Sequence, residues 1–253
     1  MFNKFIPIII AAASFIIWEA VIADPKNFWY SLAVFLVVFV SGFLKLHGFK
    51  TAHKKEMWLL AAPPFFLAAL AGAVLLFLNV PWVAHTLAFT VAAAVYIYLT
   101  RVYTFLFAIT RYQPLALERL SSFMAVASFA FAGIAAYGCM NFLNASLWQT
   151  ALAVAAVSFV LTYQFLWVNK IDEQQNVFAS FLVTILLVEF FWAISFFPVT
   201  HFISGLALAI LYYVVVNLTL LHFLDKLEKK LAGTYLVVGG VCILMVLLSA
   251  KWL

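Results

Sequence analysis

The sequence predicts an all-α membrane protein, a polytopic transmembrane helical bundle of about nine spans, from its composition and from the spacing of its apolar segments. Hydrophobic residues make up 68% of the 253 residues and charged residues 9%, whereas soluble domains are about 45–50% apolar and about 25% charged. The mean hydropathy is +1.15. This composition excludes a soluble fold. Apolar stretches of roughly 20 residues, the length that crosses a hydrocarbon core, recur along the whole chain.

Turn-forming residues separate the apolar stretches, for example Asp24 with Pro25, Pro198 and Gly233. The connections are too short to hold a second folded domain. We therefore expect one integral membrane domain, residues 1–253, with spans at 5–22, 28–46, 58–78, 82–100, 121–142, 147–168, 177–197, 200–223 and 234–252.

The first span could be mistaken for a signal peptide that has Lys4 as its charged region. Trp18 and Glu19 stand where a cleavage site needs small residues. We therefore expect a retained first span.

The third and fourth spans carry irregular features. Pro63 and Pro64 lie one turn inside the third span, where proline is compatible with a helix start or a kink. The fourth span stays apolar beyond Arg101, so residues 102–110 either extend the helix or lie flat at the interface. We favour one long helix that ends before Pro114.

The fifth span is rich in small residues at a spacing that lets helix backbones approach closely in lipid. These are Ala125, Ala132, Gly133 and Ala136. We expect this span at the centre of the bundle, and spans two, eight and nine, which carry bulkier side chains, in contact with lipid.

Basic residues accumulate in alternate connections, which predicts a cytoplasmic N-terminus and an outer C-terminus. This orientation places twelve of the fourteen basic residues on the inner side, and Lys26 and Lys251 outside. The same orientation places six tryptophans near the outer interface, where indole rings favour the headgroup region. They are Trp18, Trp29, Trp82, Trp148, Trp192 and Trp252.

Four ionisable side chains in the outer half of the predicted bundle are the candidate substrate or proton site: Glu189, Glu19, His85 and His201. Ionisable residues inside a membrane are costly and are associated with function. Glu189 is the deepest, about nine residues or ~13 Å from the end of its span. Glu19 lies within about one turn of the end of the first span, and both histidines begin their spans.

Two carboxyl groups and two imidazoles could bind a divalent metal, relay protons or hold a cationic substrate, provided that they converge. No metal-binding motif such as H-E-x-x-H occurs. We therefore predict neither a metal site nor a cofactor, and a purely structural role, such as a protonated Glu189 bonded to a neighbouring helix, is the alternative.

The clustered basic side chains suit lipid headgroups by charge. The residues predicted to contact headgroups are Lys50, Lys54, Lys55, Arg101 and Arg111. Because the basic residues form short clusters between spans, we expect membrane lipids as partners and no nucleic acid.

The sequence contains no nucleotide-binding or hydrolase motif and no motif that identifies a family. We expect a non-enzymatic multi-pass protein of the cell inner (plasma) membrane, either a small permease (transporter) or a membrane-embedded subunit that contacts other membrane subunits. The alternative is a membrane enzyme that acts on a lipid or lipid-linked substrate at the outer leaflet through Glu19, Glu189, His85 and His201.

Overall fold

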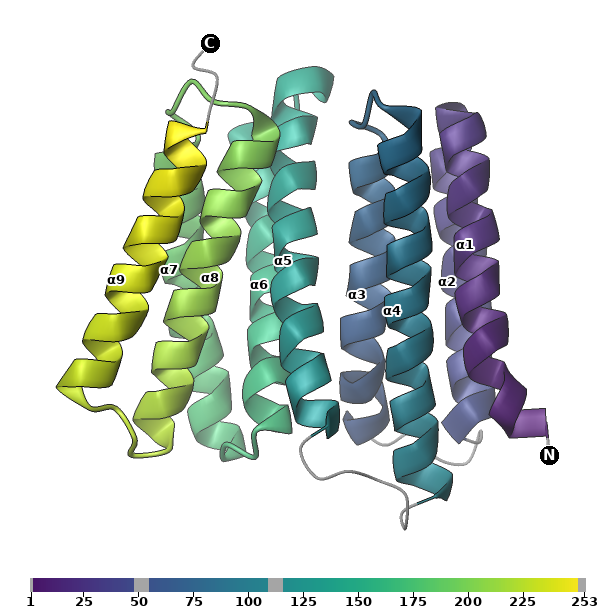
Figure 1. The fold of residues 1–253 in the computed structure, drawn as a ribbon, viewed down its shortest axis with the longest axis horizontal. Coiled ribbons are helices and arrows are strands. Elements are labelled where there is room, and N and C mark those ends of the chain that lie inside the picture. Colours follow the sequence, from purple (N-terminus) through teal and green to yellow (C-terminus); the bar gives the residue numbers. More distant parts are fainter. Residues whose placement is uncertain (1, 48–54, 109–115, 250–253) are drawn as a thin grey trace. The chain divides into compact units, whose positions relative to one another are not determined.

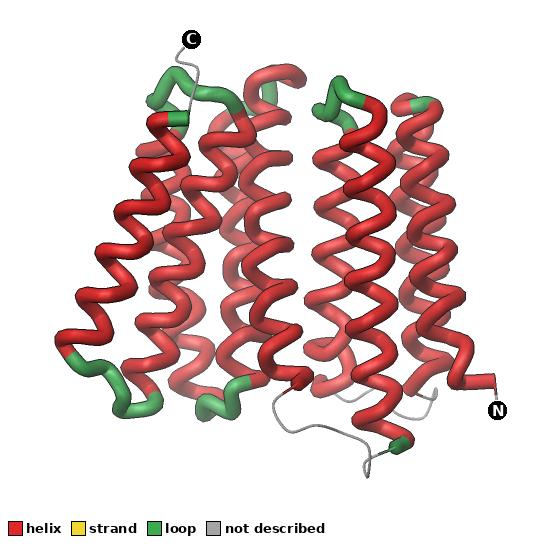
Figure 2. The backbone as a smooth tube through the Cα atoms, in the orientation of Figure 1, coloured by secondary structure: helices red, strands yellow, loops and turns green. Residues whose placement is uncertain are grey.

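A computed structural model describes residues 2–47, 55–108 and 116–249, which form helices joined by short loops (Figure 2). Two short 3₁₀ helices, η1 (Phe2–Phe5) and η2 (Pro25–Asn27), precede α1 (Ile6–Ala23) and α2 (Phe28–His47). The helices that follow are α3 (Lys55–Leu75), α4 (Pro81–Phe107), α5 (Ala116–Leu143), α6 (Leu147–Val168), α7 (Glu173–Ile194), α8 (His201–Phe223) and α9 (Lys229–Leu248).

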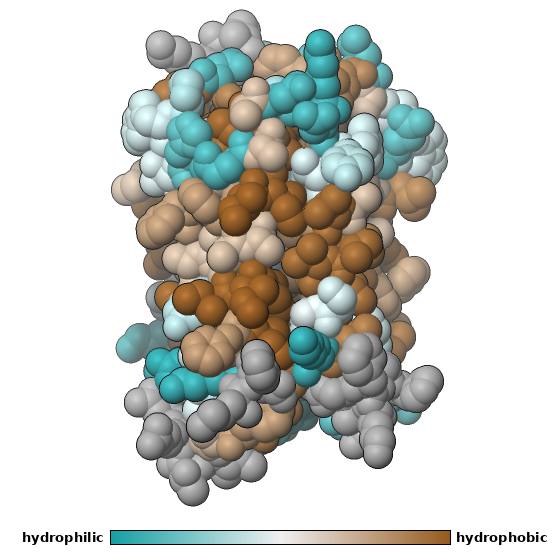
Figure 3. Space-filling model, turned by 90° about the vertical axis from the view of Figure 1, so that its right-hand side faces the viewer, coloured by the Kyte–Doolittle hydropathy of each residue, from teal (hydrophilic) through white to brown (hydrophobic). Residues whose placement is uncertain are grey.

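Within these described ranges, α1 to α9 are each long and apolar enough to cross a membrane. This confirms the predicted all-helical protein and its nine candidate spans. On the face shown in Figure 3, apolar side chains gather across the middle and hydrophilic ones toward both ends. That distribution is typical of a membrane-spanning protein.

The helix bounds differ from the predicted spans where polar residues continue a helix. Helix α7 begins four residues before the predicted span, because Asp172 caps it by accepting a hydrogen bond from the backbone N–H of Gln174 at 3.2 Å. Helix α4 runs unbroken to Phe107 and passes an exposed Arg101. The prediction of one long helix that ends before Pro114 is therefore confirmed, with its end at Phe107, and Pro114 itself lies outside the described residues.

The chain divides into two compact units, Met1–Met124 and Ala125–Leu253, and the boundary falls inside helix α5. Figure 1 shows α5 as one continuous helix. In the first unit α1 packs against α2 and α4, and α3 packs against α4. In the second unit α7 packs against α6 and α8, and α8 packs against α9. The prediction of one membrane domain over residues 1–253 stays a prediction.

Trp18 is buried inside the first unit, with 1% of its surface exposed. Its ring lies 5.3 Å from that of Phe35 and fills the space that a side chain at Gly72 would need. The prediction that Trp18 belongs to an interfacial belt is therefore wrong. Four of the other predicted belt residues are exposed, namely Trp29, Trp82, Trp148 and Trp192, and Trp252 lies outside the described residues.

The two prolines of α3 lie well inside the helix, which begins at Lys55. Proline has no backbone N–H, so Pro64 donates nothing to the carbonyl of Leu60 one turn earlier. The hydroxyl of Tyr98 on α4 donates to that carbonyl at 3.0 Å in a buried position. A neighbouring helix thus satisfies the backbone group that the proline leaves free.

Helices α5 and α8 approach closely in the second unit at two glycines. A Cβ atom at Gly205 would lie 2.5 Å from the backbone nitrogen of Ile134, and one at Gly133 would lie 3.1 Å from the Cα of Gly205. The close approach predicted from the small residues of the fifth span is present. Helix α9 is exposed along most of its length, because Gly239 is its only buried residue within the described part of the chain. The lipid contact expected of the ninth span stays a prediction. Helix α8 buries more of its surface.

Candidate functional site

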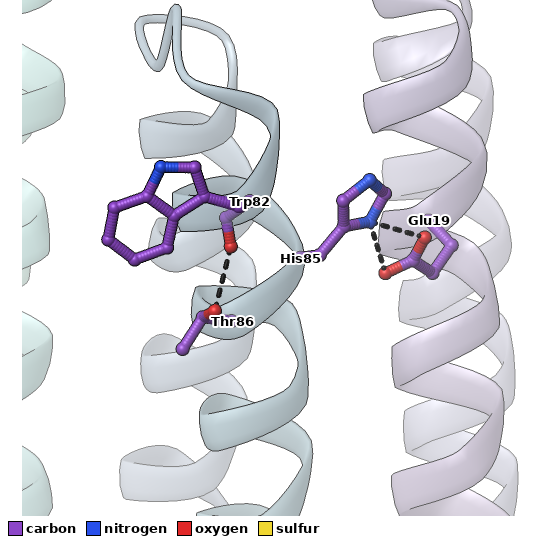
Figure 4. Close-up of polar contacts among 4 residues, drawn as sticks. All are labelled: Glu19, Trp82, His85 and Thr86. Atoms are coloured by element: carbon purple, nitrogen blue, oxygen red, sulfur yellow. Dashed lines mark hydrogen bonds and ion pairs between the residues drawn. The ribbon is translucent and has the colours of Figure 1, made fainter.

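Glu19 and His85 lie side by side at one end of the first unit (Figure 4). Helices α1 and α4 pack against each other, and Glu19 is four residues from the end of α1 while His85 is in the second turn of α4. The Nδ1 atom of His85 lies 2.9 and 3.0 Å from the two carboxylate oxygens. The structure therefore joins two of the four predicted site residues.

Both members of this pair are accessible, since the side chain of His85 is 52% exposed and that of Glu19 is 29% exposed. A carboxylate that holds an imidazole in one orientation, with the other ring nitrogen open to a substrate, is an arrangement used in general acid–base chemistry. An exposed contact of this kind between a carboxylate and an imidazole contributes little to stability, about 1 kcal/mol at most.

Glu189 lies on the outer surface of the second unit, where its side chain is exposed. It lines a groove of about 420 Å³ between α6 and α7. The groove is lined by Leu147, Trp148, Ala151, Val188, Glu189 and Trp192. Helix α7 ends at Ile194, so the carboxyl is five residues or about 7.5 Å from the helix end instead of the ~13 Å expected.

Glu189 forms no hydrogen bond or ion pair within the part of the chain that the structure describes. A carboxylate in a membrane span costs roughly 2.5–3.5 kcal/mol at the bilayer centre on insertion scales, and less toward the interface. The carboxyl group of Glu189 is therefore available to a molecule that lies against α6 and α7 from outside the chain.

His201 has a different environment. It is the first residue of α8 and is 7% exposed. Its ring centroid lies 5.2 Å from that of Phe142 in an edge-to-face arrangement and 4.1 Å from that of Phe202. His201 is not among the side chains that line the groove beside Glu189. Its aromatic packing favours a structural role.

The four predicted residues are divided between the units, Glu19 and His85 in the first and Glu189 and His201 in the second. A single site formed by all four stays a prediction. Among the described residues, no three His, Cys, Asp or Glu side chains are close enough to hold a metal ion.

Of the predicted headgroup contacts, Lys55 and Arg101 have exposed side chains at the start of α3 and near the end of α4. Lys50, Lys54 and Arg111 lie outside the described residues.

Residues 123–249 match the family described as protein of unknown function (DUF5656), over half of the chain. The chain belongs to the DUF5656 family. This DUF5656 protein is a multi-pass membrane protein by the length and composition of its helices. No curated protein and no solved structure matches it.

The DUF5656 match covers nearly the same residues as the second compact unit. Glu189, His201 and the groove residues fall inside the matched region, whereas Glu19 and His85 fall outside it. We therefore expect the features that the family shares to lie in α5–α9.

Sequence reasoning does not group the two groove tryptophans, Trp148 and Trp192, with Glu189. Their depth alone predicts a position at the outer interface. Their common depth with Glu189, at the start of α6 and the end of α7, is the signal that could have grouped them.

Proposed function

We propose that the protein is a membrane-embedded subunit of a larger assembly in the cell inner (plasma) membrane, and that it docks on a partner span through α9. The observation that carries this proposal is an exposed stripe on that helix. Val237 is 65% exposed and Leu244 is 60% exposed, and a Cβ atom at Gly233 or Gly240 would meet nothing within 4 Å among the described residues. Steps of four, three and four residues place these side chains on one face. The stripe consists of Gly233, Val237, Gly240 and Leu244.

A stripe of this kind suits a second transmembrane helix. Between helices in lipid, close packing replaces the hydrophobic effect as the driving force, and small residues allow that packing. Gly233 and Gly240 leave gaps on this face, and Val237 and Leu244 project from it, so the surface suits interdigitation with the side chains of another helix. Gly239, one position away, packs against Val214 of α8, so α9 has one face toward its own chain and another that is open.

The position of Glu189 supports a subunit over a permease. A permease that uses Glu189 needs a hydrated cavity that reaches this side chain. Glu189 instead lines a groove on the outer surface of the second unit, beside exposed Trp148 and Trp192.

The test is association in a native-like bilayer. The protein is extracted in lipid nanodiscs, and its stoichiometry and bound membrane proteins are measured by native mass spectrometry. Gly240→Leu, which fills the gap at that position, is expected to remove the bound span. Val238→Leu is the matched control, because Val238 is exposed but about 200° around the helix from Gly240. A wild-type protein that carries no second span, or association equal in both variants, contradicts the proposal.

The proposal includes an orientation with the N-terminus inside and the C-terminus outside. It is supported in the first unit by Lys45 and Arg101, near the ends of α2 and α4, and by Lys55 at the start of α3. In the second unit Lys170 and Lys229 follow α6 and begin α9. Such residues are typical of the cytoplasmic side, where they contact anionic lipid.

Cysteine labelling from outside the cell tests the orientation. With Cys139 and Cys242 replaced by serine, Asn144→Cys is expected to react with an impermeant maleimide and Asp225→Cys to react only after permeabilisation. The reverse pattern refutes the orientation.

The second candidate is an enzyme that acts on a lipid or lipid-linked substrate at the outer leaflet, with Glu19, His85, Glu189 and His201 as its polar groups. The contact between Glu19 and His85 favours it. Purified protein incubated with a total lipid extract is expected to change the lipid mass spectrum, and Glu19→Gln and His85→Gln to abolish that change. An unchanged spectrum with the wild type rules this candidate out.

A further inference from the structure

The groove beside Glu189 has the size and shape of a ligand site. Its volume of about 420 Å³ falls within the roughly 300–1,000 Å³ that small-molecule pockets occupy. Leu147, Ala151 and Val188 give it an apolar wall, and among the described residues that line it the carboxyl of Glu189 is the one ionisable group. The groove therefore combines a large apolar surface with a single anionic point, a pattern that fixes the orientation of an amphiphilic ligand.

The charge of that ligand follows from Glu189. Its carboxylate has no partner in the described chain, and a membrane span disfavours an unpaired acidic group. None of the groove residues carries a positive charge. A cation supplied from outside the chain would pair with the carboxylate.

The two tryptophans indicate which kind of cation would bind beside Glu189. Trp148 is 84% exposed and Trp192 is 54% exposed, and both line the groove with Glu189. The faces of indole rings attract ammonium groups, and aromatic side chains are a recurrent feature of ammonium-ligand sites. Trp148 is the second residue of α6 and Trp192 is two residues from the end of α7, so the rings lie where a span meets the headgroup region.

We propose that this groove binds a membrane lipid with an ammonium headgroup, such as phosphatidylethanolamine. The ammonium group lies at Glu189 between the tryptophans, and an acyl chain lies along the apolar wall. A lipid is favoured over a soluble amine because the groove opens on the side of a candidate span and is mostly apolar. The proposal is independent of α9, which contributes no residue to the groove.

Lipid retention in native mass spectrometry tests the proposal. The protein is reconstituted in vesicles of equal parts phosphatidylethanolamine and phosphatidylglycerol, extracted in detergent, and the ratio of bound lipids is measured. The wild type is expected to retain phosphatidylethanolamine over phosphatidylglycerol by at least roughly fivefold, as one ammonium contact of this kind provides. Glu189→Gln, which keeps the side-chain size, is expected to lower the ratio to about one.

Two further variants keep the result interpretable. Trp148→Leu retains apolar area but removes the ring, and is expected to lower the ratio while the thermal unfolding temperature stays near that of the wild type. Glu228→Gln is the matched control, because Glu228 is exposed and makes no capping hydrogen bond with its side chain at the start of α9. It is expected to leave the ratio unchanged.

Three outcomes of the retention measurement would overturn the proposal. They are equal retention of both lipids by the wild type, an unchanged ratio in folded Glu189→Gln, and an equal loss of preference in Glu228→Gln. Displacement of the bound lipid by soluble glycerophosphoethanolamine at low millimolar concentration would also overturn it, because the headgroup alone would then account for binding.

Discussion

Substitution of Gly205 by alanine tests the closest approach between helices in the second unit. The added Cβ atom would lie 2.5 Å from the backbone nitrogen and 2.7 Å from the Cα of Ile134. These are backbone atoms of α5 and no rotamer change relieves them. Ordinary contacts are 3.4–4 Å, so α5 and α8 have to separate by about 1 Å, a misfit that costs about 1–3 kcal/mol in a packed interior.

The matched control is Gly233→Ala, whose Cβ atom meets nothing within 4 Å among the described residues. Both substitutions gain the same helix propensity, up to about 1 kcal/mol, so the difference between them isolates the steric cost. We expect Gly205→Ala to be less stable than Gly233→Ala by about 1–3 kcal/mol.

The assay is unfolding of the purified protein in mixed micelles by titration with a denaturing detergent, followed by tryptophan fluorescence. Gly133→Ala provides a variant of intermediate steric cost. Its nearest contact is 3.1 Å, to the Cα of Gly205, so its cost should be smaller than that of Gly205→Ala. Equal unfolding free energies for Gly205→Ala and Gly233→Ala would refute the close approach.

Three further predictions use the same unfolding assay. Tyr98→Phe removes the buried hydrogen bond to the Leu60 carbonyl and should cost about 1–3 kcal/mol, because that carbonyl loses a buried donor; no loss of stability would mean that another donor reaches the carbonyl. A double-mutant cycle on Glu19→Gln and His85→Gln should give a coupling energy below about 1 kcal/mol, because both side chains are accessible to solvent, 52% of His85 and 29% of Glu19; a coupling of several kcal/mol would contradict that accessibility. Ser146→Ala breaks the capping box at the start of α6 and should cost about 1 kcal/mol; an unchanged midpoint would argue against the cap.

The number and approximate position of the helices followed from the sequence, because an apolar run of about 20 residues has few structural alternatives in lipid. The bounds were less predictable where polar residues continue a helix. Hydropathy does not indicate that Asp172 caps α7, nor that α4 ends at Phe107.

The direction in which a side chain faces was harder to predict than its depth. Helix α7 is apolar on all sides, so nothing in its sequence indicated that Glu189 faces outward instead of into the bundle. The burial of Trp18 depends on the absence of a side chain at Gly72, more than fifty residues away. The contact of Glu19 with His85 requires α1 and α4 to be neighbours, and pairing of helices that are not consecutive cannot be deduced from hydropathy.

The hydrogen bond from Tyr98 to Leu60 makes the proline at position 64 and the tyrosine at position 98 mutually dependent. Pro64→Ala would restore a backbone N–H that competes for the same carbonyl, and the loss of the hydroxyl should then matter less. The stability cost of replacing Tyr98 therefore depends on whether Pro64 has already been replaced. A chain that has lost the proline tolerates other residues at position 98, whereas a chain that loses the tyrosine first leaves the buried Leu60 carbonyl without its donor. Among relatives that include the first unit, we expect the two positions to change together.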